Sequence, residues 1–541
     1  MKITHQFKGQ NVGREIDSSL PIAFLLPNKA GGMLYFDARK DKTQYYTNIK
    51  GKTVKVLHDI NASGNVVGVS HKLHSIAITR KEDEHELFVP HYLNGLVIKS
   101  NAQNPLQLVL ELRHVKDSDK KEHSVEQKQG RVIIRSTSEA GEIYTAIQGD
   151  NLAYEHSKDN TEGNSRILLD ILSTKMSLAV ADNENDAIML TNHIFTNEQK
   201  IKEIQENYSA SSRKFNDPEA ELAYACALNC IDHAIMSANS PGQSPFFSEV
   251  TGHHKAIASH AFLLEGEFKA VKKMLLDEVE LQSKRLMQGT ASFEEAAWPM
   301  LLLGRMLNNL CASGKLYNYF SKEELKETAI KIVEIAELAE QAHVEKSMSE
   351  PAKLESEALM LSIYDLAFAL TKAEKFGEAE KKLREEAKAH ILGDIAEVQL
   401  RGHAEKDDVK SVFLAAYTYP LMLSKEGWKE TFDTLLGMMH DSFDTLQSKM
   451  LKDTEEETLK LDLFGLKSLA AIVLARTDAE RYEKRVNEIM RDSISNVLYK
   501  GVVGRPSSSF VQDADPETEA IIEDAHVLNN ALFLEMLREC S

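Results

Sequence analysis

Acidic and histidine side chains gather where a series of apolar helices is expected to begin. Beyond Asn216 the apolar residues recur with a period of 3.6, which predicts about twelve helices. Every second helix is apolar around most of its circumference, and its start carries carboxylates or imidazoles. These residues are Glu249, His253, His254, Glu294, Glu295, Glu355, Glu357, Asp407, Asp408, Asp462, Glu523, Asp524 and His526. Carboxylate pairs can divide acid/base work on a glycosidic bond, and inverting enzymes hold them ~6.5–9.5 Å apart.

Each of these carboxylates has an alternative role at the end of its helix. Acidic side chains in a first turn accept hydrogen bonds from free backbone amides and complement the helix dipole. Capping is therefore the default interpretation of any single member. The set as a whole is stronger evidence for a site, because it would surround one opening if the helix starts face the same end.

The predicted helices alternate in character. Ala358–Ala369 and Leu463–Ala475 are apolar nearly all round, whereas Lys322–Glu340 and Glu378–Lys388 carry a charged face. Helices of the first kind belong in an interior and those of the second kind on its outside. This alternation predicts an (α/α)6 toroid of six helical hairpins. An open helical-repeat solenoid is the rival, although the sequence has no repeat of fixed length.

The N-terminal part follows a period of two, from Leu20 to about Thr196. The predicted strands are Thr53–Leu57, Val66–Val69, Ser75–Thr79, Leu96–Ile98, Leu106–Leu112, Arg131–Ser136 and Glu142–Ile147. Asn61–Asn65 and Ser138–Gly141 have the composition of hairpin turns. Many short strands without intervening helices predict an antiparallel β-sandwich. We therefore expect a sandwich domain over 1–196, a helical linker over 197–216 and the helical barrel over 217–541.

Composition excludes several classes of partner. The net charge of -19 disfavours nucleic acid and anionic membranes, which both need a basic face. No signal-peptide core follows the N-terminus, and no run approaches the ~20 apolar residues of a membrane span. Four cysteines in 541 residues indicate reduced thiols and a cytoplasmic setting. Cys226 and Cys230, four apart on a predicted helix, are better explained as buried small side chains than as metal ligands. We expect no metal or cofactor.

Several stretches resemble the glycogen debranching (amylo-α-1,6-glucosidase) family. Pro245–Ala258 is similar to the family pattern P-W-F-x-x-W-G-R-D-T-x-I-A, and Phe262–Ala270 to the G-L-L-L-x-T-G-R-F-x-E-A that follows it. Leu26–Gly32 looks like L-x-N-x-x-G-G, Leu354–Leu359 like V-E-I-N-A-L, and Tyr419–Glu426 like Y-P-L-L-S-x-E. The resemblance spans nearly the whole chain. It implies a β-supersandwich followed by an (α/α)6 barrel, and a glucan or oligosaccharide as substrate.

The resemblance also implies site residues. Glu355 or Glu345 would serve as the general acid, and Asp513 or Asp515 as the base. Residues implied for substrate binding are Glu249, His253, His254, Glu294, Glu357, Asp408, Asp524 and His526. The sequence departs from the family at Val250–His254, where V-T-G-H-H replaces W-G-R-D. Only two tryptophans occur, Trp298 and Trp428, and we expect both to pack in a core.

Two alternatives to a hydrolase follow from these departures. The first is a catalytically degenerate protein of the same fold that binds carbohydrate. The second is a sugar epimerase that uses histidine as acid and base, because His254, His403 and His526 all lie near the starts of apolar helices. An unperturbed imidazole has a pKa near 6.5, which suits proton transfer at neutral pH.

Overall fold

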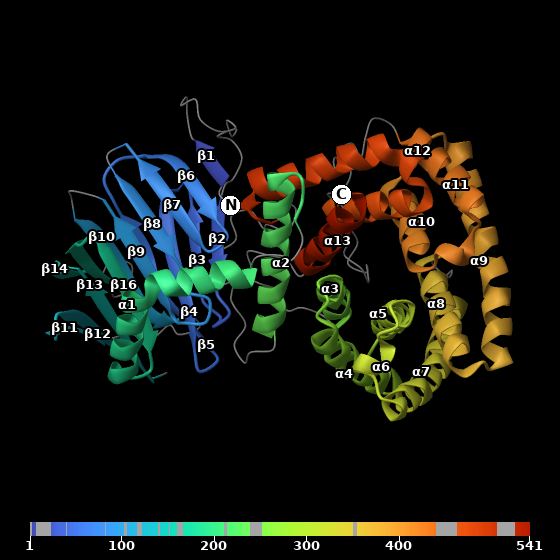
Figure 1. Cartoon of the computed structure of the whole chain (residues 1–541), viewed down its shortest axis with the longest axis horizontal. Coiled ribbons are helices and arrows are strands. Elements are labelled where there is room, and N and C mark those ends of the chain that lie inside the picture. The colour runs from blue at the N-terminus through green and yellow to red at the C-terminus, as the bar shows by residue number, and fades with distance from the viewer. Residues whose placement is uncertain are drawn as a thin grey trace. The chain divides into compact units, whose positions relative to one another are not determined.

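The computed structural model divides the chain into two compact units (Figure 1). The first contains Met1–Val250 and Ile494–His526, and the second contains Thr251–Ser493 and Val527–Ser541. The structure describes residues 3–6, 23–38, 40–81, 83–101, 105–115, 122–138, 141–150, 152–159, 166–209, 214–238, 252–349, 354–439, 463–505 and 525–541. The first unit is rich in antiparallel strands and the second consists of helices.

The strands of the first unit form two sheets. The nine-stranded sheet has the order β1 (Ile3–Gln6), β6 (Val66–Lys72), β7 (Ser75–Arg80), β8 (Glu84–Phe88), β9 (Gly95–Ser100), β16 (Lys175–Ala181), β13 (Gly141–Gly149), β12 (Arg131–Ser138), β11 (Glu122–Lys128). The eight-stranded sheet has the order β14 (Ala153–Asp159), β15 (Arg166–Leu172), β10 (Leu106–His114), β5 (Lys52–Asn61), β4 (Lys42–Ile49), β3 (Met33–Asp37), β2 (Ala23–Pro27), β17 (Val502–Val503). The sheets are joined by hydrogen bonds from Tyr45 Oη to the Gly95 carbonyl (3.0 Å) and from Ser136 Oγ to the Leu112 carbonyl (2.8 Å).

The antiparallel, strand-rich character predicted for the N-terminal part is confirmed, and all seven predicted strands lie within observed ones. The turn at Ser138–Gly141 joins two paired strands, with Ser138 opposite Gly141. The hairpin predicted at Asn61–Asn65 is wrong. It connects β5 to β6, which belong to different sheets, so the turn residues there carry the chain from one layer to the other.

A long helix, α1 (Glu184–Ser209), packs on strands β16, β13 and β9 of the nine-stranded sheet (Figure 1). It begins at Glu184, inside the region where the alternating pattern predicts strands, and before the predicted linker at 197–216. The Asn183 side chain caps it by accepting the Asp186 amide (2.9 Å). Its buried residues Ala187, Thr191 and Ile194 recur at helical spacing. This segment is therefore a covering element of the first unit rather than a free connector.

The sequence motif over Leu26–Gly32 forms a tight loop between β2 and β3. The Asn28 carboxamide oxygen accepts the backbone amides of Ala30 (3.1 Å) and Gly32 (2.6 Å), and its nitrogen donates to the Leu93 carbonyl (3.0 Å). Gly31 has a φ of 83°. A Cβ at Gly32 would lie 2.9 Å from Asn28 Nδ2. The asparagine and the glycines are thus required by the local backbone.

The first unit also contains α2 (Pro218–Ala238), which carries Cys226 and Cys230. Both thiols are free and buried, as expected. Burial raises the pKa of each thiol, so both are neutral. Among the described residues no group of three or more His, Cys, Asp or Glu side chains has the arrangement of a metal site.

The helices from Gly252 onward lie in the region where the period of 3.6 predicts helices. They are α3 (Gly252–Leu264), α4 (Phe268–Met287), α5 (Phe293–Ala312), α6 (Leu316–Tyr319), α7 (Lys322–Ser349), α8 (Leu354–Thr371), α9 (Glu374–Arg401), α10 (Lys406–Thr418), η2 (Pro420–Met422), α11 (Lys425–Met438), α12 (Leu463–Tyr499), and α13 (Ala525–Cys540). α12 is kinked at Asp478, which has extended backbone angles, and its last residues from Ile494 belong to the first unit. None of the described helices combines the length and apolar character needed to cross a bilayer.

Burial separates two kinds of helix, as the sequence pattern predicted. Fourteen of the 20 residues of α5 are buried, against five of the 28 residues of α9. The apolar helices pack side by side: α3 on α5, α5 on α8, and α8 on α10. The amphipathic helices α4, α7 and α9 pack against them. The starts of α5 and α8 therefore lie on neighbouring helices.

Candidate functional site

The predicted site residues are described to different extents. Glu249, Asp513, Asp515 and Asp524 lie outside the described residues, together with Glu523. Four others lie in helices but with side chains outside the described part: His253 and His254 in α3, Glu345 in α7, and His526 in α13. The roles implied for all of these residues stay predictions. Glu294, Glu355, Glu357, Asp408 and His403 are described.

Two carboxylates at the start of α5 have separate roles. Glu295 forms a capping box with Ser292: its side chain accepts the Ser292 amide (2.9 Å), and Ser292 Oγ accepts the Glu295 amide (3.2 Å). The neighbouring Glu294 is only 3% exposed and does not take part in this cap. Instead its Oε1 accepts a hydrogen bond from Ser356 Oγ of α8 (2.8 Å). Capping therefore explains Glu295, whereas Glu294 is a buried carboxylate held between two helix starts.

The carboxylates of α8 point to different sides of that helix. Glu357 is buried, and its Oε1 lies 2.6 Å from His390 Nδ1 of α9. Ser356 faces α5 through Glu294, so Glu355 lies on the side of α8 away from Glu357, since two residues span about 200° of a helix. Glu355 is partly exposed. The structure thus brings Glu294 and Ser356 together and directs Glu357 toward the outer helix.

Burial raises the pKa of Glu357 to about 6, although the neighbouring His390 opposes the shift. Burial disfavours the charged form of a carboxyl, and the nearby Glu386 and Asp394 add to the effect. Perturbed carboxyls of this kind gather at functional sites, although structural ion pairs perturb pKa values as well. The contact with exposed His390 favours a structural explanation for Glu357.

Asp408 acts as a cap. Its Oδ2 accepts the backbone amide of Glu405 (2.8 Å) and a hydrogen bond from the Arg401 guanidinium (2.6 Å), which ties the end of α9 to the start of α10. His403 lies in the same connection, with Nε2 3.6 Å from a carboxylate oxygen of Glu405. The described contacts of both residues belong to this junction, and the part predicted for them in substrate binding or epimerisation stays a prediction.

Sequence reasoning missed a second polar group, centred on a buried carboxylate in the later turns of the apolar helices. The Glu535 cluster consists of Glu535 of α13, with His260 of α3, Arg305 of α5, Tyr417 of α10 and Arg476 of α12. Tyr417 Oη donates to Glu535 Oε2 (2.6 Å) and Arg476 Nη2 donates to Oε1 (2.6 Å), while His260 Nε2 lies 3.2 Å from Oε1. The Arg305 guanidinium lies over the Tyr417 ring and donates to the Tyr417 carbonyl. One carboxylate therefore joins four helices directly and α5 through Tyr417.

The charges of the Glu535 cluster reinforce one another. Burial alone would raise the pKa of Glu535, but His260, Arg476 and Arg305 outweigh it and hold this pKa far below its ordinary value. The pKa of the Tyr417 phenol is raised, first by burial and then by Glu535. The cluster consequently contains an ionised carboxylate and a neutral phenol. A single charge within the apolar stretch Leu532–Leu537 is the sequence signal that marks such a residue.

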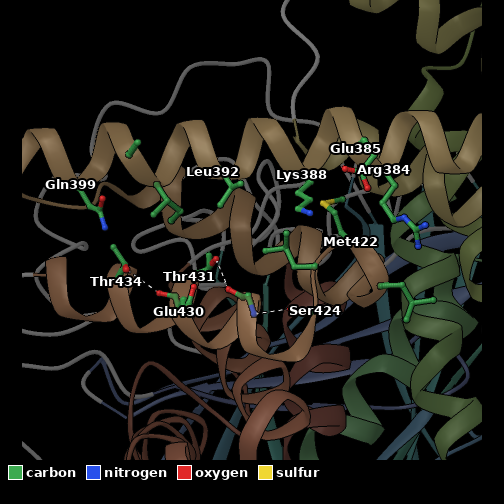
Figure 2. Close-up of a pocket in the computed structure, with 15 residues that line it drawn as sticks. Arg384, Glu385, Lys388, Leu392, Gln399, Met422, Ser424, Glu430, Thr431 and Thr434 are labelled. Carbon is green, nitrogen blue, oxygen red and sulfur yellow. Dashed lines mark hydrogen bonds between the residues drawn. The ribbon is translucent and has the colours of Figure 1, made fainter.

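A groove of about 590 Å³ lies on the helical unit between α9 and α11 (Figure 2). Arg384, Lys388 and Leu392 of α9 form one wall, and Thr431 and Thr434 of α11 lie opposite. The Thr431 and Thr434 hydroxyls donate to carbonyls of their own helix. None of the predicted site residues lines this groove, which includes the start of α11 but no residue from the starts of α5, α8 or α10.

Comparisons with known proteins identify a distant structural similarity and no family. No protein-family model matches the chain, and no curated protein matches it. One solved structure that it resembles is the GH92 family glycosyl hydrolase CcMan5, with 9% sequence identity over 97% of this chain and 84% of that one, at a TM-score of 0.37. Neither the fold nor the activity of this chain follows from a similarity at that level.

Proposed function

We propose that this protein is a glycoside hydrolase-like enzyme that acts on an α-glucan or an α-linked oligosaccharide. The observation that carries the proposal is the buried pair Glu294 and Ser356, which joins the first turns of two adjacent apolar helices. A buried carboxylate with a hydroxyl partner at a helix start suits recognition of sugar hydroxyls. Glu355, next to Ser356, is the described carboxylate that we propose as the general acid.

The proposed architecture is a closed six-hairpin toroid. The packing series α3, α5, α8 and α10 supports it, and so does the Glu535 cluster, which connects α3, α10, α12 and α13. In such a ring the starts of the inner helices surround one end and the Glu535 cluster fills the other. Substrate would then enter at the end of the ring where the inner helices begin.

In the proposed mechanism Glu355 or Glu345 protonates the glycosidic oxygen as its bond to the anomeric carbon breaks. Asp513 or Asp515, as base, takes a proton from the water that attacks this carbon on the opposite face of the sugar. The assignment rests on the sequence resemblance to debranching enzymes. It is tested with the purified chain and α-1,6- and α-1,4-linked glucose oligosaccharides, by following the release of reducing sugar. Substitution of the base by asparagine is expected to lower kcat by roughly 10²–10⁴. Absence of sugar release from every substrate by the folded protein would refute the proposal.

A binding protein without turnover is the second candidate. The replacement of the family W-G-R-D by Val250–His254 favours it, because tryptophan, arginine and aspartate are lost together. Calorimetry with the same oligosaccharides separates the two functions. Binding without sugar release supports the second candidate, whereas measurable turnover that disappears in Glu355→Gln supports the first.

A further inference from the structure

The two tryptophans of the chain differ in whether the indole N–H donates to a described acceptor. Trp428 of α11 is buried, and its indole Nε1 donates to the Pro420 carbonyl (2.8 Å). Its ring stacks on Phe432 with centroids 5.4 Å apart, and Phe432 stacks on Phe413. Trp428 is therefore a satisfied core residue, as expected from the sequence.

Trp298 of α5 is equally buried, with an exposed fraction of 2%, but its indole Nε1 donates to none of the described residues. A buried donor without an acceptor is unfavourable by about 1–3 kcal/mol. Buried Trp N–H groups usually have a partner for this reason. The expectation that Trp298 is only a core residue accounts for its burial and leaves its N–H unexplained.

The position of Trp298 on α5 shows which residues share its face of the helix. Glu294 precedes it by four residues and Arg305 follows it by seven, so the three side chains share one face of the helix. Glu294 is bonded to Ser356 of α8, and Arg305 is bonded to the carbonyl of Tyr417 in α10. This face of α5 is therefore turned toward the other apolar helices. Trp298 lies on it one turn below Glu294.

We infer that Trp298 is a ligand-binding residue, whose indole N–H donates to a hydroxyl of an α-linked glucose oligosaccharide bound at the helix starts. This inference rests on the proposed function and deepens it. An indole N–H is only a donor, so its ligand must offer an acceptor. A sugar hydroxyl does so, and can donate in turn to a carboxylate. The carboxylate of Glu294, one turn away, disfavours an anionic ligand beside Trp298.

The chain provides its own reporter for the test. In Trp428→Phe, Trp298 is the only tryptophan, and its emission is followed during titration with maltotriose and with isomaltotriose. Sorbitol at matched concentration controls for the effect of solvent. We expect a saturable change in emission with at least one of the trimers and none with sorbitol. Emission that stays unchanged with both trimers would overturn the inference.

Calorimetric titration of Trp298→Phe with the trimer that responds is the second measurement. Phenylalanine keeps an apolar ring and removes the N–H, so affinity is expected to fall roughly five- to tenfold. Trp428→Phe is the matched control for loss of a buried indole, and it should bind as the unmodified chain does. Melting temperatures of both variants show whether either has lost its fold. Should Trp298→Phe fail to fold, the emission titration of Trp428→Phe still decides.

The failure of this inference is distinguishable from that of the proposed function. Sugar release that is unaltered in Trp298→Phe, together with Trp298 emission that does not change on titration, overturns the inference. The proposed hydrolase function would then still stand. A saturable emission response without sugar release supports the inference and places the protein in the binding class.

Discussion

Tyr417 donates its phenol hydrogen to Glu535 across 2.6 Å, and both side chains are buried between apolar helices. The carboxylate that accepts it is also bonded to Arg476 and lies beside His260. This contact lies in the later turns of the helices, at a distance from the carboxylates of the helix starts. The helical unit thus has a buried polar cluster that is separate from the carboxylates of the helix starts.

Loss of the Glu535 charge should destabilise the helical unit strongly. Glu535→Gln removes the buried charge that Tyr417, Arg476 and His260 share, and leaves Arg476 with only the partly exposed Glu539 as counter-ion. The loss of these hydrogen bonds to a charged group should cost about 1.5–3 kcal/mol. Calorimetric unfolding should show a clearly lower transition. Glu539→Gln is the matched control, because Glu539 also pairs with Arg476 but is partly exposed, so it should cost about 0–1 kcal/mol. Equal effects of the two substitutions would contradict the role of the cluster.

Two glycine-to-alanine substitutions should act in opposite directions. Gly32→Ala places a Cβ 2.9 Å from Asn28 Nδ2 and 3.1 Å from the Tyr46 carbonyl oxygen, so the loop must shift and the protein loses stability. Gly393→Ala lies in α9 with nothing within 4 Å of the new Cβ, and it should stabilise by about 0.5–1 kcal/mol. Melting temperatures measure both. A stabilising Gly32→Ala would show that the Asn28 loop is not tightly constrained.

The first unit should be sensitive to acid because of four buried histidines. Burial lowers the pKa of His5 and His91 to about 4, and the pKa of His71 and His74 to about 3. An unfolded histidine has a pKa near 6.5, so between these values the unfolded chain binds more protons than the folded one. Stability therefore falls as the pH drops from about 6.5 toward 4.

Calorimetry between pH 7.5 and pH 4.5 tests this sensitivity. His71→Asn should reduce the slope of the melting temperature against pH. His193→Asn, at an exposed position of α1, should leave the slope unchanged. A melting temperature independent of pH over this range would argue against neutral buried imidazoles.

Glu355 and Glu357 should differ in their effect on turnover. They are two residues apart on α8, and Glu357 is bound to His390 of the outer helix. If sugar release is found, Glu355→Gln should lower kcat by roughly 10²–10⁴, and Glu357→Gln should leave kcat within a few-fold of its starting value. If Glu357→Gln lowered kcat and Glu355→Gln did not, the catalytic acid would be Glu357, on the side of α8 that faces α9.

The sequence by itself predicted most of the elements, although α1 begins inside the stretch where strands were expected. The change from a period of two to a period of 3.6 separated strands from helices, because alternation and helical spacing reflect which face of each element is buried. Local chemistry also predicted that acidic residues would cap helix starts, as Glu295 of α5 does. These features depend on residues close together in the chain, so their spacing is enough to predict them.

Only the tertiary structure decided which polar residues meet. The sequence grouped Glu294 with Glu295, and Glu355 with Glu357. Packing instead paired Glu294 with Ser356 and Glu357 with His390. It also brought five residues from five helices into the Glu535 cluster. Contacts between helices depend on crossing geometry and on rotation about each axis, and a change of one residue turns a side chain by about 100°. The same dependence left the Trp298 indole N–H without a described acceptor, which its position in the sequence did not reveal.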